Sequence, residues 1–428
     1  YLPRVQWTQN PNQLTYQWQS RDQHKLELRL VDLSSNKQKV LLTETSDTWL
    51  NLHDDLHFLK DDKGFIWASE RDGYKHLYYY DFNGKLQRQL TRGDWVVDEL
   101  DAVNEKLGTV YFTARKDTPL ERHLYQVSLD GGDIKRLTEP NYDHALVMAK
   151  DGSSFIDSFS NVTTPNKVAL RALDGTVLTW LEQNELDKTH PLTAYHAQLT
   201  APRFGTIKAE DGQTMHYRMF EPAAFEPGKK YPVIVSVYGG PHAQRVTNSW
   251  SARDLYLHYL VQQGYLVFQL DNRGSYNRGK AFEDPIYKKL GVAEIADQIK
   301  GVEYLRSLPY VDAGKIAIYG HSYGGYMAIM AMFKASDYFA AGVSGAPVTD
   351  WALYDTHYTE RYLGHPKDNA AGYEASAVFP YADGLKGKLL IYHGMADDNV
   401  LFTHSTKLYK QLQDKGLLFD MINYPGSK

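Results

Sequence analysis

Cysteine is absent from the 428 residues of the chain. Disulfide bonds, cysteine-bound metals and a thiol nucleophile are therefore excluded, while cytoplasm and periplasm remain equally compatible with this composition. An apolar run of the ~18 residues that a membrane span requires is also missing. The chain starts at Tyr1 without an initiator methionine or a charged-then-apolar leader, so we interpret it as a mature product or a fragment.

A large excess of acidic or basic residues is also missing. The net charge is −5 and no long block of like charge occurs, so neither nucleic acid nor an anionic membrane surface is an expected partner. Tyrosine, in contrast, is abundant with 32 residues, which suits β-strands and an aromatic binding site with polar tips. The length exceeds the roughly 250–300 residues at which a single core stops growing. We therefore expect two domains.

A repeat runs through the first part of the chain. The landmarks His-Leu-Tyr, Asn-Gly and Leu-Thr at residues 76–91 recur 47 residues later, with Asp-Gly as the turn, and a weaker copy ends at residue 43. A fourth hairpin has its turn at residues 174–175. Repeats of this length with several strands each are typical of β-propeller blades, although a β-sandwich is the alternative. Because only about four blades fit, we expect the ring to begin upstream of Tyr1.

The sequence pattern changes near residue 200. Short apolar runs at residues 233–238, 265–270, 316–319, 340–344 and 389–392 alternate with helical patterns at 253–263, 293–308 and 404–415. This alternation predicts a parallel sheet with helices on both faces, an α/β-hydrolase-like, doubly wound and mostly parallel sheet. With a linker at residues 192–203, the predicted domains are 1–192, a partial propeller, and 193–428, the catalytic domain.

The pattern G-H-S-Y-G at residues 320–324 follows the apolar strand 315–319 and precedes a helical stretch at 325–333. This is the setting of a nucleophile elbow, in which the serine sits on a sharp turn and side chains at the glycine positions would clash. The sequence therefore predicts a serine hydrolase whose nucleophile is Ser322.

A serine nucleophile needs a histidine base and a carboxylate that orients it, in the chain order Ser, acid, His. Asp397 and Asp398 follow the strand at 388–392 and are the candidate acids. The remaining downstream histidine, His404, lies in the predicted helix and is interpreted as a helix-surface residue. We therefore expect the base to lie immediately beyond Lys428.

An oxyanion hole is the last requirement. The backbone N–H of Tyr323, directly after the nucleophile, is one expected donor. Tyr238 follows the strand at 232–237 and precedes two glycines, where hydrolases of this fold place a second donor. Its phenol either donates to the oxyanion or merely packs.

With these motifs the chain resembles the prolyl oligopeptidase family, and within it the bacterial dipeptidyl peptidases of type IV. The resemblance covers nearly the whole chain, and its marks lie at residues 237–241, 271–275, 320–325, 355–362 and 393–400. It implies release of X-Pro or X-Ala dipeptides from peptide N-termini through an acyl-enzyme, without cofactor or metal. By position it assigns Ser322 as nucleophile, Asp397 as triad acid, and Tyr238 with the Tyr323 amide as oxyanion hole.

The resemblance also implies a substrate site. A pocket for the proline ring would be formed by Tyr323, Tyr354, Tyr358, Val348 and Val400, and Asn399 would contact a substrate carbonyl. The family's catalytic histidine would directly follow Lys428, and its amine-binding glutamates and carbonyl-binding arginine would lie upstream of Tyr1. A homodimer, a bacterial origin and a periplasmic or secreted location are further expectations from the resemblance.

Three other functions compete with this interpretation. Another post-proline or acyl-aminoacyl peptidase would use the same scaffold, although the tyrosines at 358–362 favour the dipeptidyl type. A non-catalytic propeller scaffold with a vestigial hydrolase domain would explain a missing histidine but not the preserved elbow, acid loop and oxyanion segment. A carboxylesterase would explain the elbow but not the propeller.

Overall fold

The computed structural model describes residues 1–149 and 152–428 and divides them into two compact units. Unit 1 comprises Tyr1–Pro191 with Thr247–Trp250 and Asn277–Ala281, and unit 2 comprises Leu192–Val246, Ser251–Tyr276 and Phe282–Lys428. The division into residues 1–192 and 193–428 stays a prediction, and no sequence pattern indicated that two short later segments join unit 1.

Hydrogen bonds explain why one of these segments joins unit 1. The Asn248 side chain donates to Glu121 Oε1 at 2.8 Å and accepts from the Val162 amide at 3.3 Å. The Asn248 amide donates to the carbonyl oxygen of Leu120 at 2.9 Å. One asparagine thus bridges two loops that lie far from it in sequence.

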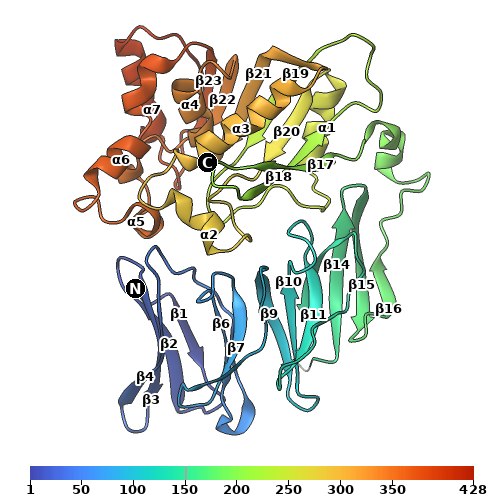
Figure 1. Ribbon diagram of the computed structural model, residues 1–428, viewed down its shortest axis with the longest axis vertical. Helices are drawn as coiled ribbons and strands as arrows, with labels where there is room; N and C mark the ends of the chain where they lie inside the picture. Colours follow the sequence, from blue (N-terminus) through green and yellow to red (C-terminus); the bar gives the residue numbers. More distant parts are fainter. Residues whose placement is uncertain (150–151) are drawn as a thin grey trace. The chain divides into compact units, whose positions relative to one another are not determined.

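Unit 1 consists of four sheets, each with four antiparallel strands joined in sequence order (Figure 1). This is the strand order that the repeat predicts for propeller blades, and the hairpins at residues 83–84, 130–131 and 174–175 lie where expected. The strands are β1 Arg4–Trp7, β2 Gln13–Gln19, β3 Lys25–Asp32, β4 Lys37–Thr45, β5 Leu56–Phe58, β6 Phe65–Ser69, β7 His76–Tyr80, β8 Leu86–Gln89, β9 Val97–Asn104, β10 Thr109–Ala114, β11 His123–Ser128, β12 Lys135–Arg136, β13 Asp143–Met148, β14 Ser154–Asn161, β15 Thr164–Ala172 and β16 Val177–Glu182.

Neighbouring sheets of unit 1 pack face to face. In β6, Phe65 and Trp67 join a buried cluster with the first sheet, whereas Ile66 and Ala68 join a cluster with the third. Successive side chains of a strand point to opposite faces, so every residue of β6 is buried. Stacking of this kind gives inner strands without a polar face, as a propeller requires.

The repeated landmarks make equivalent contacts. His76 and His123 are both buried, and their Nδ1 atoms lie 3.0 and 3.1 Å from the hydroxyls of Thr91 and Thr138. The same hydroxyls accept hydrogen bonds from the backbone amides of Leu77 and Leu124. The sequence repeat therefore marks a structural repeat, a histidine–threonine pair in the second and in the third sheet.

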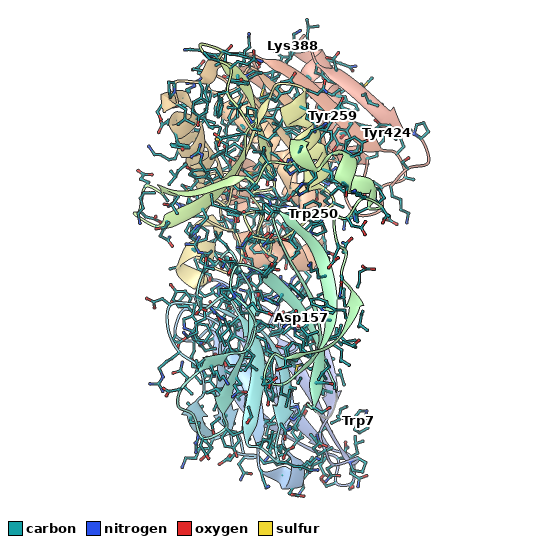
Figure 2. The ribbon with its side chains drawn as sticks, turned by 90° about the vertical axis from the view of Figure 1, so that its right-hand side faces the viewer. Trp7, Asp157, Trp250, Tyr259, Lys388 and Tyr424 are labelled. Carbon is teal, nitrogen blue, oxygen red and sulfur yellow. The ribbon has the colours of Figure 1, made fainter. Side chains whose placement is uncertain are left out.

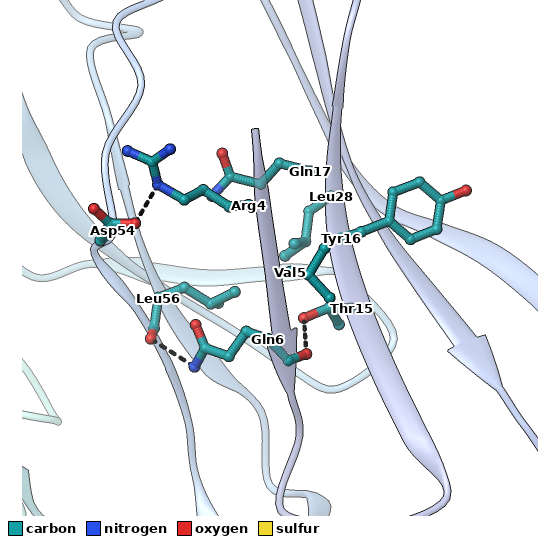
Figure 3. A pocket seen from close by; sticks show the side chains of 9 residues that line it. All are labelled: Arg4, Val5, Gln6, Thr15, Tyr16, Gln17, Leu28, Asp54 and Leu56. Atoms are coloured by element: carbon teal, nitrogen blue, oxygen red, sulfur yellow. Dashed lines mark hydrogen bonds and ion pairs between the residues drawn. The ribbon is translucent and has the colours of Figure 1, made fainter. Parts of the chain in front are cut away.

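A small pocket between the first two sheets contains paired polar groups (Figure 3). Arg4 forms an ion pair with Asp54, Gln6 Nε2 donates to the Leu56 carbonyl at 3.3 Å, and the Thr15 hydroxyl donates to the Gln6 carbonyl at 2.9 Å. The first two contacts fasten β1 to β5 and the residues before it, and the third ties β1 to β2.

Unit 2 contains one eight-stranded sheet in the order β17-β18-β20-β19-β21-β22-β23-β24. β18 is antiparallel to both neighbours, and the strands from β20 to β24 are parallel. The predicted mostly parallel sheet is thereby confirmed. The strands are β17 Arg203–Lys208, β18 Thr214–Phe220, β19 Tyr231–Val237, β20 Leu266–Leu270, β21 Val311–His321, β22 Ala341–Gly345, β23 Lys388–Gly394 and β24 Asp420–Tyr424.

Helices lie along this sheet, and α4 packs on β21 and β22 while α3 packs on β21 and β17. Tyr259 on α1 and Tyr424 on β24 are exposed at the surface of unit 2 (Figure 2). Within the described residues, none of the helices combines the length and apolar character of a membrane crossing. The helices are α1 Asp254–Gln262, α2 Lys280–Glu283, α3 Ala293–Ser307, α4 Tyr323–Lys334, α5 Thr356–Leu363, α6 Ala370–Ser376 and α7 Thr403–Asp414, with short 3₁₀ turns at Lys60–Asp62, Pro191–Ala194, His196–Gln198, Asp284–Ile286, Trp351–Leu353 and Phe379–Gly384.

The strand order reverses at β19. The chain passes from β19 to β20 on one side, and then from β20 across to β21 on the other side of β19. The carboxyl ends of β19 and β21 therefore flank a topological switch point, where open α/β sheets bind their ligands. Val237 pairs with Gly320 across these strands, so the residues after both strands lie at one level.

Asp101 on β9 gives unit 1 a testable pH dependence. Burial raises the pKa of Asp101 to about 7, with repulsion from Glu99 as a second cause, and its Oδ2 has no hydrogen-bond partner within the described residues. Since this pKa exceeds that of the unfolded chain, the stabilising contribution of the protonated carboxyl is lost as pH rises from about 4 to 7.

Asp101→Asn should therefore be more stable than wild type at pH 8, by roughly 1–3 kcal/mol, the usual cost of a buried unsatisfied polar group. The gap should close at pH 4. Urea unfolding at both pH values measures this, with the exposed Asp133→Asn as matched control. Equal gaps at pH 4 and pH 8 would contradict the assignment.

Candidate active site

Ser322 occupies the turn between β21 and α4 with φ 60° and ψ −120°. Positive φ is costly for a residue with a side chain and persists only where the surroundings impose it. Here the Ser322 amide donates to the Gly345 carbonyl at 2.9 Å, and its own carbonyl accepts from the Tyr326 amide at 3.0 Å. α4 begins at Tyr323, two residues earlier than the sequence predicts, because the turn is completed within one residue.

The glycines around Ser322 permit close backbone contacts. A Cβ on Gly320 would lie 2.2 Å from the Gly324 carbonyl oxygen, and a Cβ on Gly324 would lie 2.3 Å from the Val237 carbonyl oxygen. Neither partner is a flexible side-chain end that is able to yield. The G-x-S-x-G pattern thus allows the first turn of α4 to touch the end of β19.

The acid loop follows β23 at the same edge of the sheet. Asp397 Oδ1 accepts from the amides of Asn399 and Val400, both at 2.9 Å. Asp398 instead is exposed and forms an ion pair with Lys428. Of the two candidate acids, Asp397 alone is held rigidly by its own loop, which favours it as the triad acid.

Behind Asp397 lies a histidine that the sequence reasoning missed. His393 is fully buried, with Nε2 2.8 Å from the Val400 carbonyl and 3.3 Å from Asp397 Oδ2. Its Nδ1 lies 2.7 Å from the Ser405 hydroxyl. Since a carbonyl only accepts, Nε2 carries the hydrogen and Nδ1 accepts from Ser405. His393 thereby supports the acid loop, and its burial excludes it as the base for Ser322.

The structure contradicts the prediction for His404. This residue faces inward from α7 and is fully buried, with Nδ1 accepting from the Thr349 amide at 3.1 Å. Burial lowers the pKa of His404 to about 4. The helix periodicity is the signal that the prediction overlooked, because Leu408 and Leu412 lie one and two turns after His404 on the same buried face.

Tyr238 lies directly after β19, as predicted, and its ring centroid is 6.0 Å from that of Tyr323. The Arg245 guanidinium stands 4.9 Å from the Tyr238 ring. Burial raises the pKa of Tyr238, and the Arg245 charge acts in the opposite direction. The phenol therefore stays protonated at neutral pH and is able to donate a hydrogen bond.

Buried Asp271 holds the loop that carries Arg245. Its two carboxylate oxygens accept from the amides of Arg245 and Val246 at 2.8 and 2.9 Å. Asp271 belongs to the D-N-R-G-S motif at residues 271–275, so one motif at the end of β20 fixes the loop beside Tyr238.

The predicted pocket residues converge on one side chain that the prediction omitted. Trp351 is buried, and its ring centroid lies 5.4 Å from that of Tyr323, 5.9 Å from Tyr354 and 6.1 Å from Tyr358. Its place in the sequence after β22, at the same sheet edge as Ser322, is the signal that points to it. The other predicted residues of this set, Val348 and Val400, are buried in the segments after β22 and β23.

Asn399 lies beside this aromatic group. The Tyr354 phenol donates to Asn399 Oδ1 at 2.9 Å, and Asn399 itself is exposed. With its oxygen engaged, the amide nitrogen of Asn399 remains as a donor for an incoming carbonyl group.

Two family models match the chain. Residues 1–166 match the model described as Dipeptidyl peptidase IV (DPP IV) N-terminal region, and residues 250–428 match the model of the prolyl oligopeptidase family. The chain belongs to the prolyl oligopeptidase family. The predicted combination of propeller and α/β-hydrolase architecture is thereby confirmed.

Relatives agree with this membership. Human dipeptidyl peptidase 8 is 36% identical over 90% of this chain, which spans 47% of that protein. The crystal structure of Porphyromonas gingivalis dipeptidyl peptidase 4 is 32% identical, with a TM-score of 0.92 over 99% of this chain and 60% of that one. A solved structure from Bacteroides ovatus is 35% identical, with a TM-score of 0.92 over 100% of this chain and 63% of that one. The chain thus spans about half the length of the curated relatives it matches.

Gly324→Ala tests the close packing of the elbow. The added Cβ would meet the Val237 carbonyl oxygen, so we expect the free energy of unfolding to fall by about 1–3 kcal/mol, as for other overpacked sites. Gly314→Ala is the control, because its Cβ would have only an ordinary contact, 3.6 Å from Asp312. Urea unfolding measures both variants, and equal stabilities would show that the elbow tolerates a side chain.

Proposed function

We propose that the protein releases N-terminal dipeptides with proline or alanine at the second position, through an acyl-enzyme on Ser322. The observation that carries this proposal is the elbow at the switch point, which places Ser322 at the same level as Tyr238 and at the same sheet edge as Asp397. Membership of the prolyl oligopeptidase family and the name of the human relative support the dipeptidyl type.

In this mechanism the Ser322 hydroxyl attacks the carbonyl carbon that follows the second residue, and a histidine takes the hydroxyl proton. Asp397 orients this histidine and stabilises its charged form. The Tyr323 amide and the Tyr238 phenol donate to the oxygen on which negative charge develops. The histidine then protonates the leaving amine, and water releases the dipeptide from Ser322 by the same steps. The base remains the histidine predicted directly after Lys428.

The aromatic group around Trp351 supports the preference for proline. Tyr323, Tyr354 and Tyr358 supply ring faces, and Val348 and Val400 supply aliphatic surface. Burial raises the pKa of each of these tyrosines, so they stay neutral and suit a flat, uncharged ring. Asn399 is proposed to bind a substrate carbonyl through its free amide nitrogen. A homodimer and a periplasmic or secreted location stay predictions.

The first test uses the full-length parent protein. We expect it to hydrolyse Gly-Pro anilide much faster than Gly-Leu anilide, and not to cleave an N-acetylated Gly-Pro anilide. An organophosphonate probe should label wild type and not Ser322→Ala. Equal turnover of the Pro and Leu substrates would refute the post-proline assignment. Preference for the acetylated substrate would favour an acyl-aminoacyl peptidase, and absent labelling would favour a non-catalytic scaffold.

Tyr238→Phe tests the phenol as an oxyanion donor. A donor that acts mainly in the transition state should change kcat and leave KM nearly constant. We expect kcat to fall about 10²–10³-fold, as for loss of one oxyanion donor elsewhere. Tyr256→Phe, on the exposed face of α1, is the matched control. A kcat within about threefold of wild type would assign Tyr238 to packing.

A further inference from the structure

The first turns of α3 present a polar face that is buried. Glu294, Asp297 and Gln298 are at most 1% exposed. Their spacing of three and four residues places them on one side of the helix. Buried polar groups are costly unless hydrogen bonds satisfy them, so this face is expected to bind specific partners. Those partners belong to the loops of the candidate active site.

Glu294 holds Tyr323. Its Oε1 accepts from the Tyr323 phenol at 2.6 Å and from the Gly291 amide at 3.0 Å, and its Oε2 accepts from the Val292 amide at 3.1 Å. Burial raises the pKa of Glu294, whereas these donors act in the opposite direction. Tyr323 is therefore tied at both ends, by its backbone in the elbow and by its phenol on α3.

The ring between these two ends has little room to move. A Cβ on Gly240 would lie 2.5 Å from the Tyr323 ring, so the glycine segment after Tyr238 lies directly against it. Tyr326 contacts the ring edge-on with a centroid distance of 5.4 Å. A shift of the phenol would consequently be transmitted to the Tyr323 backbone.

Gln298 reaches the other proposed oxyanion donor. Its Nε2 donates to Asn272 Oδ1 at 2.9 Å, and Asn272 Nδ2 donates to the Gly239 carbonyl, also at 2.9 Å. Gly239 directly follows Tyr238. The chain of hydrogen bonds thus runs from α3 to the turn that carries the Tyr238 phenol.

Asp297, between these two residues, fixes the loop after β20. Its carboxylate accepts from the Arg273 amide at 2.9 Å and from the Arg273 guanidinium at 2.7 Å. Arg273 follows Asn272, so this ion pair holds the residue through which Gln298 acts.

We propose that the polar face of α3 positions the oxyanion hole, with Glu294 acting on the Tyr323 amide and Gln298 acting through Asn272 on Tyr238. This inference rests on the proposed function. The two donors follow neighbouring strands, β19 and β21, whose pairing sets their level, and α3 adds hydrogen bonds behind the two segments that carry them. Oxyanion donors stabilise the transition state because they are held in place before the charge develops. Glu294 and Gln298 are accordingly positioning residues that do not touch the substrate.

Glu294→Gln in the full-length protein is the principal test. Glutamine keeps the shape, but its NH₂ group would face one of the donors that Glu294 now accepts from. We expect kcat to fall about 10–100-fold while KM changes less than about threefold, since the loss is confined to the transition state. Affinity for a Gly-Pro boronate, which forms a tetrahedral adduct on Ser322, should fall in parallel with kcat/KM. Affinity for the dipeptide Gly-Pro should not change.

Controls separate positioning from a loss of folding. Glu303 lies on the same helix in an exposed ion pair with Lys300. Glu303→Gln should therefore leave kcat, KM and the affinities for the boronate and the dipeptide unchanged. Organophosphonate titration counts the folded sites, so kcat is expressed per active site. When Glu294→Gln is combined with Tyr323→Phe, kcat should fall no further than in Tyr323→Phe alone. Both changes act on the same hydrogen bond, the one from the Tyr323 phenol to Glu294.

Gln298→Leu is an independent second variant with the same expected effect on kcat, here through Tyr238. The inference is wrong if Glu294→Gln or Gln298→Leu is folded, titrates fully and keeps kcat within twofold of wild type. It is also wrong if boronate and dipeptide lose affinity equally. A wild-type protein that hydrolyses none of the substrates would instead overturn the proposed function, before any variant is compared.

Discussion

The contact between the first turn of α4 and the ends of β19 and β22 is the constraint on which the site depends. An ideal Cβ on Gly324 would lie 2.3 Å from the Val237 carbonyl oxygen, and one on Gly325 equally close to the Gly345 carbonyl oxygen. With hydrogen in place of a side chain, the helix settles onto the sheet and Ser322 is forced to φ 60°. The strain is compensated by the packing of α4, whose side chains from residue 323 to 333 are all buried.

A second layer of buried polar groups makes this geometry rigid. His393 and two backbone amides hold Asp397, and Glu294 holds Tyr323. Removing any of these groups from water is unfavourable, and the hydrogen bonds offset that cost only in one arrangement. The site is therefore specified by polar contacts behind it as much as by the residues that line it.

Unit 1 is held together by apolar packing between neighbouring sheets. The inner strand β6 is covered on both faces, and its alternate residues pack against two different neighbouring sheets. The hairpin turns and the histidine–threonine pairs identify the second and third sheets in the sequence, and a hairpin turn identifies the fourth. The repeat is therefore recognisable in the sequence although β6 lacks alternating polarity.

Local pattern by itself determined the hairpins, the alternation of strand and helix, the elbow at Ser322 and the place of Tyr238, because turn chemistry and periodicity act over a few residues. Only the tertiary structure decided that Trp351 joins the aromatic group, and that Glu294 and His393 support the site. Trp351 and Glu294 both contact Tyr323, which is distant from them in sequence, whereas His393 is close in sequence to Asp397 but is buried by the packing of the domain. The sequence alone does not show whether a polar side chain is solvated or paired in the interior. Burial and partner are set by long-range packing, which no local pattern encodes.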